Sequence, residues 1–408
     1  MAGQLGDREH AEWLEAEGIR LLDFGRAAVD PSGGFAWLDD TGRPDPGHPL
    51  QLWVTARMTH VYALGQLLGY PGAGALADHG VDAMTGRFRD AAHGGWYAAV
   101  DRDGPVSRDK TAYEHAFVVL AAASSVVADR PGGPGLLEEA LDVFLRRFWD
   151  EAAGMVVEQW DEPFEHLDGY RGVNANMHSV EALLAAADVT GDASLRDRAL
   201  RVTDRVVHRL SAGNSWRVPE HLDASYRPDL DYNRDEPAHP FRPFGATVGH
   251  SLEWSRLAVQ LHAALGDGAP GWLVDDARHL FETAVHDGWA VDGAPGFAYT
   301  VDWDGNPVVR QRMHWVAAEA TSAAAALHAA TGDPSYSQWY EQWWAYVATT
   351  FVDEDLGSWH HELSPDNQPS SLTWSGKPDL YHAFQATLLP RLPLAPTLAT
   401  ALAKDLLR

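Results

Sequence analysis

The sequence contains no cysteine, so disulfide bonds, thiolate nucleophiles and cysteine-ligated zinc are all excluded. Basic residues are also scarce. The chain has 31 Lys and Arg against 58 Asp and Glu, which gives a formal net charge of −27. Nucleic acids and anionic membranes both bind basic protein surfaces, and we therefore expect neither as a partner.

Long hydrophobic runs are missing as well. No run reaches the roughly 18 apolar residues that a membrane-spanning helix requires. The N-terminal stretch MAGQLGDREHAEWLEAEG is polar and acidic and contains no apolar signal core. Hydrophobic residues nevertheless make up 45% of the chain, which is typical of a globular protein. We therefore expect a cytoplasmic protein.

Several common catalytic motifs are absent too. The chain has neither a GxxxxGK[ST] phosphate loop nor a GxGxxG segment after a strand, and it has no GxSxG nucleophile elbow. His250 and Glu253 have a metal-ligand spacing, but HExxH is missing and no convincing third ligand follows. We therefore expect neither a metal nor another cofactor.

What the chain does have is an internal repeat. Patterns with apolar residues at i, i+3, i+4 and i+7 predict helices. Between them stand short segments with Gly, then alternating aromatic and β-branched or polar residues, then an Asp-rich turn, which is a hairpin signature. These segments are GGFAWLDDTGRP (33–44), GGWYAAVDRDGPV (94–106), GMVVEQWDEPF (154–164), GFAYTVDWDGNPV (296–308) and GSWHHELSPDNQP (357–369).

The unit recurs about six times, at a period of roughly 60–70 residues. We predict an all-α fold in which six helix pairs close into an (α/α)6 barrel, with β-hairpin loops at the mouth of a pocket. One catalytic domain would span residues 1–408. An open helical solenoid is the alternative. The linker 212–248 diverges from the other segments and is too long for a passive connection, which favours a functional role.

The second helix of each pair begins with polar or ionisable residues. In a ring of helix pairs these beginnings would face one pocket. Taken alone, Arg57 could form a surface ion pair and His178 could be a core histidine, but recurrence at equivalent positions favours a shared site. Neutral histidines can take and return protons near pH 7. The candidates in chain order are Arg57, Tyr113, Asn174, His178, His250, Glu253, Trp315, Glu319 and His382, and His115, His314 and His361 are weaker candidates because a histidine on such a helix is more often structural.

Five segments resemble the N-acylglucosamine 2-epimerase superfamily, in family order and over nearly the whole chain. They are TARMTHVYALG (55–65), NANMHSVEALLAA (174–186), GHSLEWSRL (249–257), HWVAAEA (314–320) and DLYHAFQATLLPR (379–391). The resemblance implies an (α/α)6 barrel and a metal-free mechanism with two acid/base histidines. HPFRPFGATVGHSLEW (239–254) is most similar to the branch of aldose–ketose isomerases that act on mannose and sulfoquinovose.

The resemblance also implies residue roles. His382 would move a proton between C2 and C1 through a cis-enediol, and His250, supported by Glu253, would assist ring opening. Arg57 would contact the substrate oxygens near C1 and C2. The remaining candidates would bind the sugar, and they are Tyr113, Asn174, His178, Arg242, Trp315 and Glu319.

We therefore predict an isomerase that acts on a monosaccharide and interconverts D-mannose and D-fructose. The alternatives within the superfamily are a 2-epimerase of mannose, cellobiose or N-acylglucosamine, and a sulfoquinovose isomerase. A glycoside hydrolase or lyase is less favoured, because the candidates are histidines with dispersed glutamates rather than two carboxylates that flank a bond. A helical-repeat binding module without catalytic activity is a further alternative. The sequence also leaves open whether the protein forms a homo-oligomer.

Overall fold

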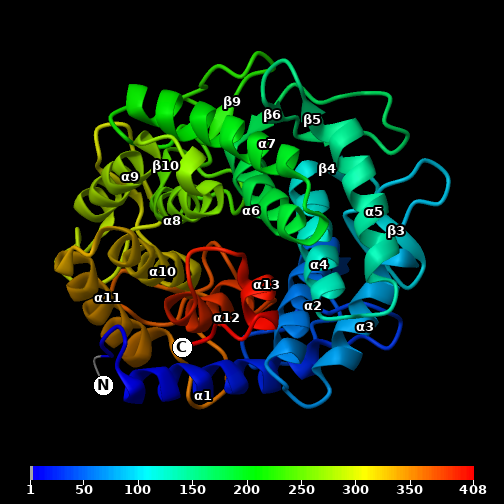
Figure 1. Ribbon diagram of the computed structural model, residues 1–408, viewed down its shortest axis with the longest axis horizontal. Helices are drawn as coiled ribbons and strands as arrows, with labels where there is room; N and C mark the ends of the chain where they lie inside the picture. Colours follow the sequence, from blue (N-terminus) through cyan, green and yellow to red (C-terminus); the bar gives the residue numbers. More distant parts are fainter. Residues whose placement is uncertain (1–2) are drawn as a thin grey trace.

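The computed structural model describes residues 3–408, and its helices form a closed ring (Figure 1). The inner helices are α2 (Leu52–Leu67), α4 (Ala112–Val127), α6 (Val173–Thr190), α8 (Val248–Leu265), α10 (His314–Thr331) and α12 (Tyr381–Leu388). The outer helices are α1 (Arg8–Gly25), α3 (Ala73–Thr85), α5 (Gly133–Val143), α7 (Ala193–Thr203), α9 (Trp272–Gly288) and α11 (Pro334–Tyr346). The predicted (α/α)6 barrel is confirmed.

Hydrophobic patterning separates the inner helices from the outer ones. In α2 every residue from Leu52 to Gly65 is buried, because this helix packs against neighbours on all sides. In α3 buried residues such as Ala73, Ala77 and Val81 form a stripe, and the rest of the helix faces solvent. A helix that is apolar all round thus lines the interior, and an amphipathic helix covers it.

The two ends of the chain close the ring. Helix α1 packs against α12 and α2 (Figure 1), and Trp359 donates its indole N–H to Glu17 of α1 at 2.7 Å. Apolar residues keep a helical spacing over 379–407 and predict one helix there, and this prediction is wrong. Helix α12 ends at Leu388, and the short helix α13 (Leu398–Ala403) follows against α2, α4 and α6. The prolines at 390, 393 and 396 interrupt the helix, since proline lacks an amide N–H and clashes with the preceding turn.

Short strands tie the beginnings of the inner helices to the hairpins. The strands just before α2, α4, α6, α8 and α10 are β1 (Leu50–Gln51), β4 (Lys110–Thr111), β8 (Arg171–Gly172), β10 (Ala246–Thr247) and β13 (Arg312–Met313). They pair antiparallel with β2 (Ala99–Asp101), β7 (Gln159–Trp160), β9 (His221–Leu222), β11 (Thr300–Val301) and β14 (Glu362–Leu363). The hairpins and the helix beginnings therefore meet at one end of the ring.

Further strand pairs complete the hairpins. β3 (Gly104–Ser107) pairs with β2, β12 (Pro307–Val309) pairs with β11, and β5 (Trp149–Asp150) pairs with β6 (Met155–Val156). The linker 212–248, which the sequence marked as divergent, also contains a hairpin, because Leu222 and Pro228 form a bridge around a turn that begins at Asp223. Only the loop that follows this hairpin, residues 229–245, is an insertion.

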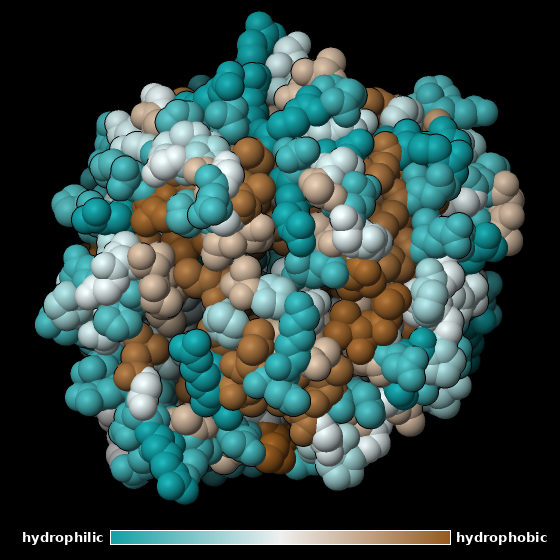
Figure 2. All heavy atoms as spheres, in the orientation of Figure 1, coloured by the Kyte–Doolittle hydropathy of each residue, from teal (hydrophilic) through white to brown (hydrophobic). Residues whose placement is uncertain are grey.

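The surface agrees with this layering. Figure 2 shows hydrophilic residues over most of the rim of the ring and hydrophobic residues between the helices nearer its centre. Within residues 3–408 no helix has both the length and the apolar character needed to cross a membrane.

Candidate active site

A cavity of about 680 Å³ lies at the hairpin end of the ring. Its walls include the beginnings of all six inner helices, as the repeat pattern predicted. Every predicted site residue except Arg242 and Glu319 lines it, and these residues are Arg57, Tyr113, Asn174, His178, His250, Glu253, Trp315 and His382. Segments far apart in the sequence therefore form one site.

In two histidines of this cavity, Nδ1 lies within hydrogen-bonding distance of a carboxylate. His382 Nδ1 lies 3.0 Å from Oε1 of Glu319, and His250 Nδ1 lies 3.0 Å from Oε2 of Glu220. Within residues 3–408 no protein group bonds to Nε2 of either ring. A neutral imidazole that donates its Nδ1–H to a carboxylate keeps the lone pair of Nε2 available. Both rings are thus prepared to accept a proton from a molecule in the cavity.

Glu253 has a different place from the one expected. We expected it to support His250, but Glu220 does so. Glu253 lies one helical turn deeper and is fully buried, and its Oε1 lies 3.3 Å from the guanidinium of Arg256. Its other oxygen has no protein partner among the described residues. Burial, followed by the nearby charge of Glu319, raises the pKa of Glu253 well above its usual range, so its carboxyl group can donate a hydrogen bond.

Arg57 brings a buried positive charge to the cavity. Its guanidinium lies 3.3 Å from a carboxylate oxygen of Asp379 and donates to the hydroxyl of Tyr113 at 2.9 Å. The rings of Phe117 and Tyr381 flank it at 4.4 and 4.7 Å. These contacts fix the guanidinium in one orientation, where it can hold a developing oxyanion.

Trp315 lies against both histidines. Its ring centroid is 5.2 Å from that of His250 and 5.6 Å from that of His382. Gly249 makes room for this indole, since a Cβ there would lie 2.3 Å from Cζ3 of Trp315. The glycine in the GHSLEW segment is therefore required by the close approach of α10 to α8.

Burial keeps four histidines of the cavity neutral at pH 7. It lowers the pKa of His178 to about 4 and that of His314 to about 4. It also lowers the pKa of His361 and of His382 well below the usual range. At pH 7 these rings are general bases and hydrogen-bonding groups rather than cations.

Two predicted residues do not line the cavity. Glu319 lies behind His382 and joins it to Arg256, whose Nε is 2.8 Å away. Arg242 packs over the ring of Tyr170 at 4.1 Å and lies 3.3 Å from the hydroxyl of Tyr232. Its neighbours on the same loop, Pro240 and Phe241, do reach the cavity.

The structure adds residues that the sequence did not single out, and it brings the weaker candidates His314 and His361 to the cavity wall. Asp379 pairs with Arg57, and its side chain accepts the amide N–H of Tyr381 at 2.9 Å, at the start of α12. Glu220, Tyr299 and His361 come from hairpins. An alignment of the hairpins at their turns would have found these three together. The aromatic residues that complete the wall are Trp53, Phe241, Tyr299 and Trp374.

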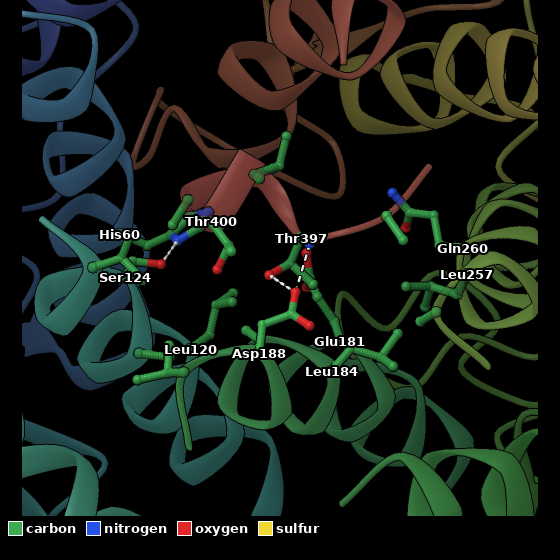
Figure 3. Close-up of a pocket in the computed structure, with 18 of the residues that line it drawn as sticks. His60, Leu120, Ser124, Glu181, Leu184, Asp188, Leu257, Gln260, Thr397 and Thr400 are labelled. Carbon is green, nitrogen blue, oxygen red and sulfur yellow. Dashed lines mark hydrogen bonds between the residues drawn. The ribbon is translucent and has the colours of Figure 1, made fainter. Parts of the chain in front are cut away.

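A second cavity of about 650 Å³ lies nearer the other end of the barrel, beside α13 (Figure 3). Alkyl side chains such as Leu120, Leu184 and Leu257 form much of its wall. Its polar groups are engaged with each other: His60 bonds Ser124 at 2.7 Å, and Asp188 accepts the amide of Thr397 at 2.7 Å. The convergent histidines and the arginine of the first cavity make that one the candidate active site.

Donor atoms close enough to share a metal ion occur twice beneath the active-site cavity. The two groups are His178, Glu181 and Glu253, and Glu253, Glu319 and His382, with ligand atoms within 4.8 Å of one another. Arg256 contacts Glu253 and Glu319 at 3.3 and 2.8 Å. A metal ion there would compete with a buried guanidinium, which makes these carboxylates a poor cation site.

Comparison with known proteins gives a consistent picture. Residues 33–386 match the model of the N-acylglucosamine 2-epimerase family. The chain is 55% identical to a D-mannose isomerase of Thermobifida fusca over 97% of both chains. It is 50% identical to a D-mannose isomerase of Pseudomonas cannabina pv. alisalensis over 97% of this chain and 95% of the relative. A crystal structure of a D-mannose isomerase superposes with a TM-score of 0.86 at 27% identity, covering 92% of this chain and 96% of that one.

Proposed function

This chain belongs to the N-acylglucosamine 2-epimerase family and is an isomerase, and from that premise we propose that it interconverts D-mannose and D-fructose. The whole chain would act as one catalytic domain. The observation that carries the proposal is the pair of histidines, His250 and His382, each with a carboxylate on Nδ1 and both facing one cavity beside Arg57. The names of the relatives supply the sugar.

In the proposed reaction His382 acts on the carbon atoms. Its Nε2 removes the proton from C2 of the open-chain aldose, and the electrons of the C–H bond form the C1=C2 bond of a cis-enediolate. The same nitrogen then returns the proton to C1. The negative charge that develops on O1 and O2 faces Arg57, and a fixed guanidinium stabilises it more than water does. Acid/base catalysis of this kind contributes roughly 10²–10⁴-fold per positioned group.

His250 would serve the oxygen atoms. Ring opening needs a proton on the ring oxygen and the loss of one from the O1 hydroxyl. Isomerisation then needs a proton on O1 and the loss of one from O2. A neutral imidazole can accept one proton and deliver another, so a single ring can perform both exchanges. No external oxidant is required, because C1 is reduced as C2 is oxidised.

The charge of the cavity favours an uncharged sugar. Within residues 3–408, Arg57 is the one arginine or lysine that lines the cavity, and Asp379 already pairs with it. The histidines with lowered pKa add no positive charge at pH 7. A sulfonate or phosphate group would enter without a matching cation, and its burial would be costly. This inventory favours D-mannose over sulfoquinovose.

The test is to incubate the purified protein with D-mannose in D2O after treatment with EDTA, and to follow the products by NMR. We expect fructose, with deuterium at C1 to the extent that the transferred proton exchanges with solvent. Glucose without fructose would assign a 2-epimerase instead. Loss of activity with EDTA that returns with added metal would contradict the metal-free mechanism. Full activity of both His250→Ala and His382→Ala would refute the site.

A further inference from the structure

One position of the hairpin recurs around the ring. It is the third residue before the first residue of the hairpin turn. The five turns begin at Asp101, Asp161, Asp223, Asp302 and Ser364. In each case its backbone carbonyl accepts the N–H of the first residue of an inner helix. These bonds join Ala98 to Leu52, Glu158 to Ala112, Glu220 to Val173, Tyr299 to Val248 and His361 to His314, at 2.8–3.1 Å. The backbone thus places five side chains equivalently around the mouth.

The five side chains at this position contact different parts of the protein. Tyr299 and His361 line the cavity. Glu220 is 4% exposed, and its two oxygens divide their contacts: Oε2 lies 3.0 Å from Nδ1 of His250, and Oε1 accepts the amide of Thr247 at 3.2 Å. Its backbone is held by α6 and its carboxylate contacts the beginning of α8. Glu220 therefore cannot move without disturbing two neighbouring inner helices.

We propose that Glu220 is the positioning residue of His250, holding the Nδ1–H tautomer and aiming Nε2 at the oxygens of the sugar. The proposal rests on the proposed function and assigns the functional role of the long linker 212–248 to a carboxylate in its hairpin, in addition to any role of Arg242.

Among the described neighbours of His250, only Glu220 is placed to hold the Nδ1–H tautomer of its ring. Within residues 3–408, Glu220 is the one acidic group within ion-pair distance of the ring. On its own helix Glu253 turns to Arg256, and from α10 the ring meets the indole of Trp315. His178 of α6 is a further nearby titratable group, and burial lowers its pKa to about 4, so it is neutral at pH 7. Without the carboxylate, either ring nitrogen could carry the proton.

The chain offers a matched control. Glu158 occupies the same hairpin position in the preceding repeat and is buried, and its Oε2 accepts the amide of Gly172 at 3.0 Å, as Glu220 does with Thr247. It contacts no histidine of the cavity. The variants Glu220→Gln and Glu158→Gln therefore remove the same charge from the same structural position, and only the first removes a contact to His250.

We expect Glu220→Gln to lower kcat for mannose–fructose interconversion about 10²-fold and to change KM less than about 3-fold. Glu158→Gln should keep kcat within about 3-fold of the wild type. In a His250→Gln background, Glu220→Gln should add little, since the two residues act as one unit.

A readout without turnover separates this proposal from the proposed function. In protein with ¹⁵N-labelled histidine, the signals of His250, assigned with His250→Gln, should show the Nδ1–H tautomer in the wild type and in Glu158→Gln, and a tautomer mixture in Glu220→Gln. Should no aldose be isomerised, this test still decides the role of Glu220. Unchanged tautomer and kcat in Glu220→Gln, or equal losses in both variants, would overturn it.

Discussion

Nδ1 of His382 lies 3.0 Å from Oε1 of Glu319, and both side chains are buried. The second oxygen of Glu319 binds Nε of Arg256 at 2.8 Å, so the carboxylate is held from below while it holds the histidine. A ring fixed in this way needs no reorientation before it accepts a proton. This arrangement predicts that Glu319 affects the rate of the reaction more than the binding of the sugar.

We expect Glu319→Gln to lower kcat about 10²-fold or more, with a change in KM of less than about 3-fold. The amide can occupy the same space, but it can equally well donate to Nδ1 and stabilise the unproductive tautomer. Steady-state kinetics with D-mannose measures both quantities.

Gln260→Ala is the control for this experiment. Gln260 accepts from Nη1 of Arg256 at 3.0 Å and lines the second cavity rather than the first. Its loss disturbs Arg256 without touching His382, so we expect a lower melting temperature and an unchanged kcat. An equal loss of kcat in both variants would mean that Glu319 acts only through Arg256 and the fold.

Arg57→Lys should lower kcat/KM by roughly 10²–10³-fold. A lysine ammonium cannot keep the contacts of the guanidinium to Asp379 and Tyr113 and still face the enediolate in the same geometry. Arg217→Lys is the matched control, because the half-buried Arg217 forms an ion pair at 2.8 Å with the buried Asp287, away from the cavity. This second variant should lose stability and keep its activity.

Much of the fold could be predicted from local pattern. The apolar character of 52–65 on all sides, the stripe of 73–84 and the repeated hairpin segments each follow from short-range sequence, and together they indicate a ring of helix pairs. The end of the chain could not be read in this way. The apolar residues of 379–407 keep a helical spacing, but the prolines at 390, 393 and 396 forbid one continuous helix.

The sequence could predict only those site residues that each repeat contributes at the beginning of its inner helix. The repeat pattern predicted that His250 and His382 lie at the mouth of the same pocket. It could not show which carboxylate contacts each ring. Glu253 is the neighbour of His250 along its helix, whereas Glu220 comes from the hairpin of the preceding repeat, 30 residues earlier. Such a contact depends on how adjacent repeats dock. The inserted loop 229–245 follows the hairpin that carries Glu220, and it made this hairpin difficult to recognise in the sequence.

Gly249→Ala should lower kcat about 10-fold or more, because overpacking a buried contact displaces its neighbours. A Cβ at this position would lie 2.3 Å from Cζ3 of Trp315 and would push the indole away from His250 and His382. Gly271→Ala serves as the comparison, since a Cβ there meets nothing within 4 Å. Wild-type kinetics of Gly249→Ala would show that the position of the indole does not matter for the reaction.

Acid should destabilise this protein steeply below about pH 6.5, the ordinary pKa of histidine. Burial lowers the pKa of His60, His178 and His314 to about 4 and that of His115 to about 3. As the pH falls from about 6.5 toward 4, the unfolded chain binds protons that the folded protein refuses, so the free energy of unfolding decreases. Each such histidine contributes about 1.4 kcal/mol per pH unit in this window. Glu114, whose pKa burial raises to about 8, and Glu253, whose pKa burial raises well above its usual range, act in the opposite direction and offset two of them.

Melting temperatures measured by calorimetry between pH 7 and pH 4.5 check this prediction. His60→Gln should reduce the slope by roughly one proton, because its ring lies outside the active-site cavity and bonds Ser124 in the second one. His166→Gln, at a side chain that is 83% exposed, should keep nearly the wild-type slope. A melting temperature that stays constant from pH 7 to pH 5 would mean that the buried histidines are protonated in the folded protein, which would also remove the basis for His382 as the base.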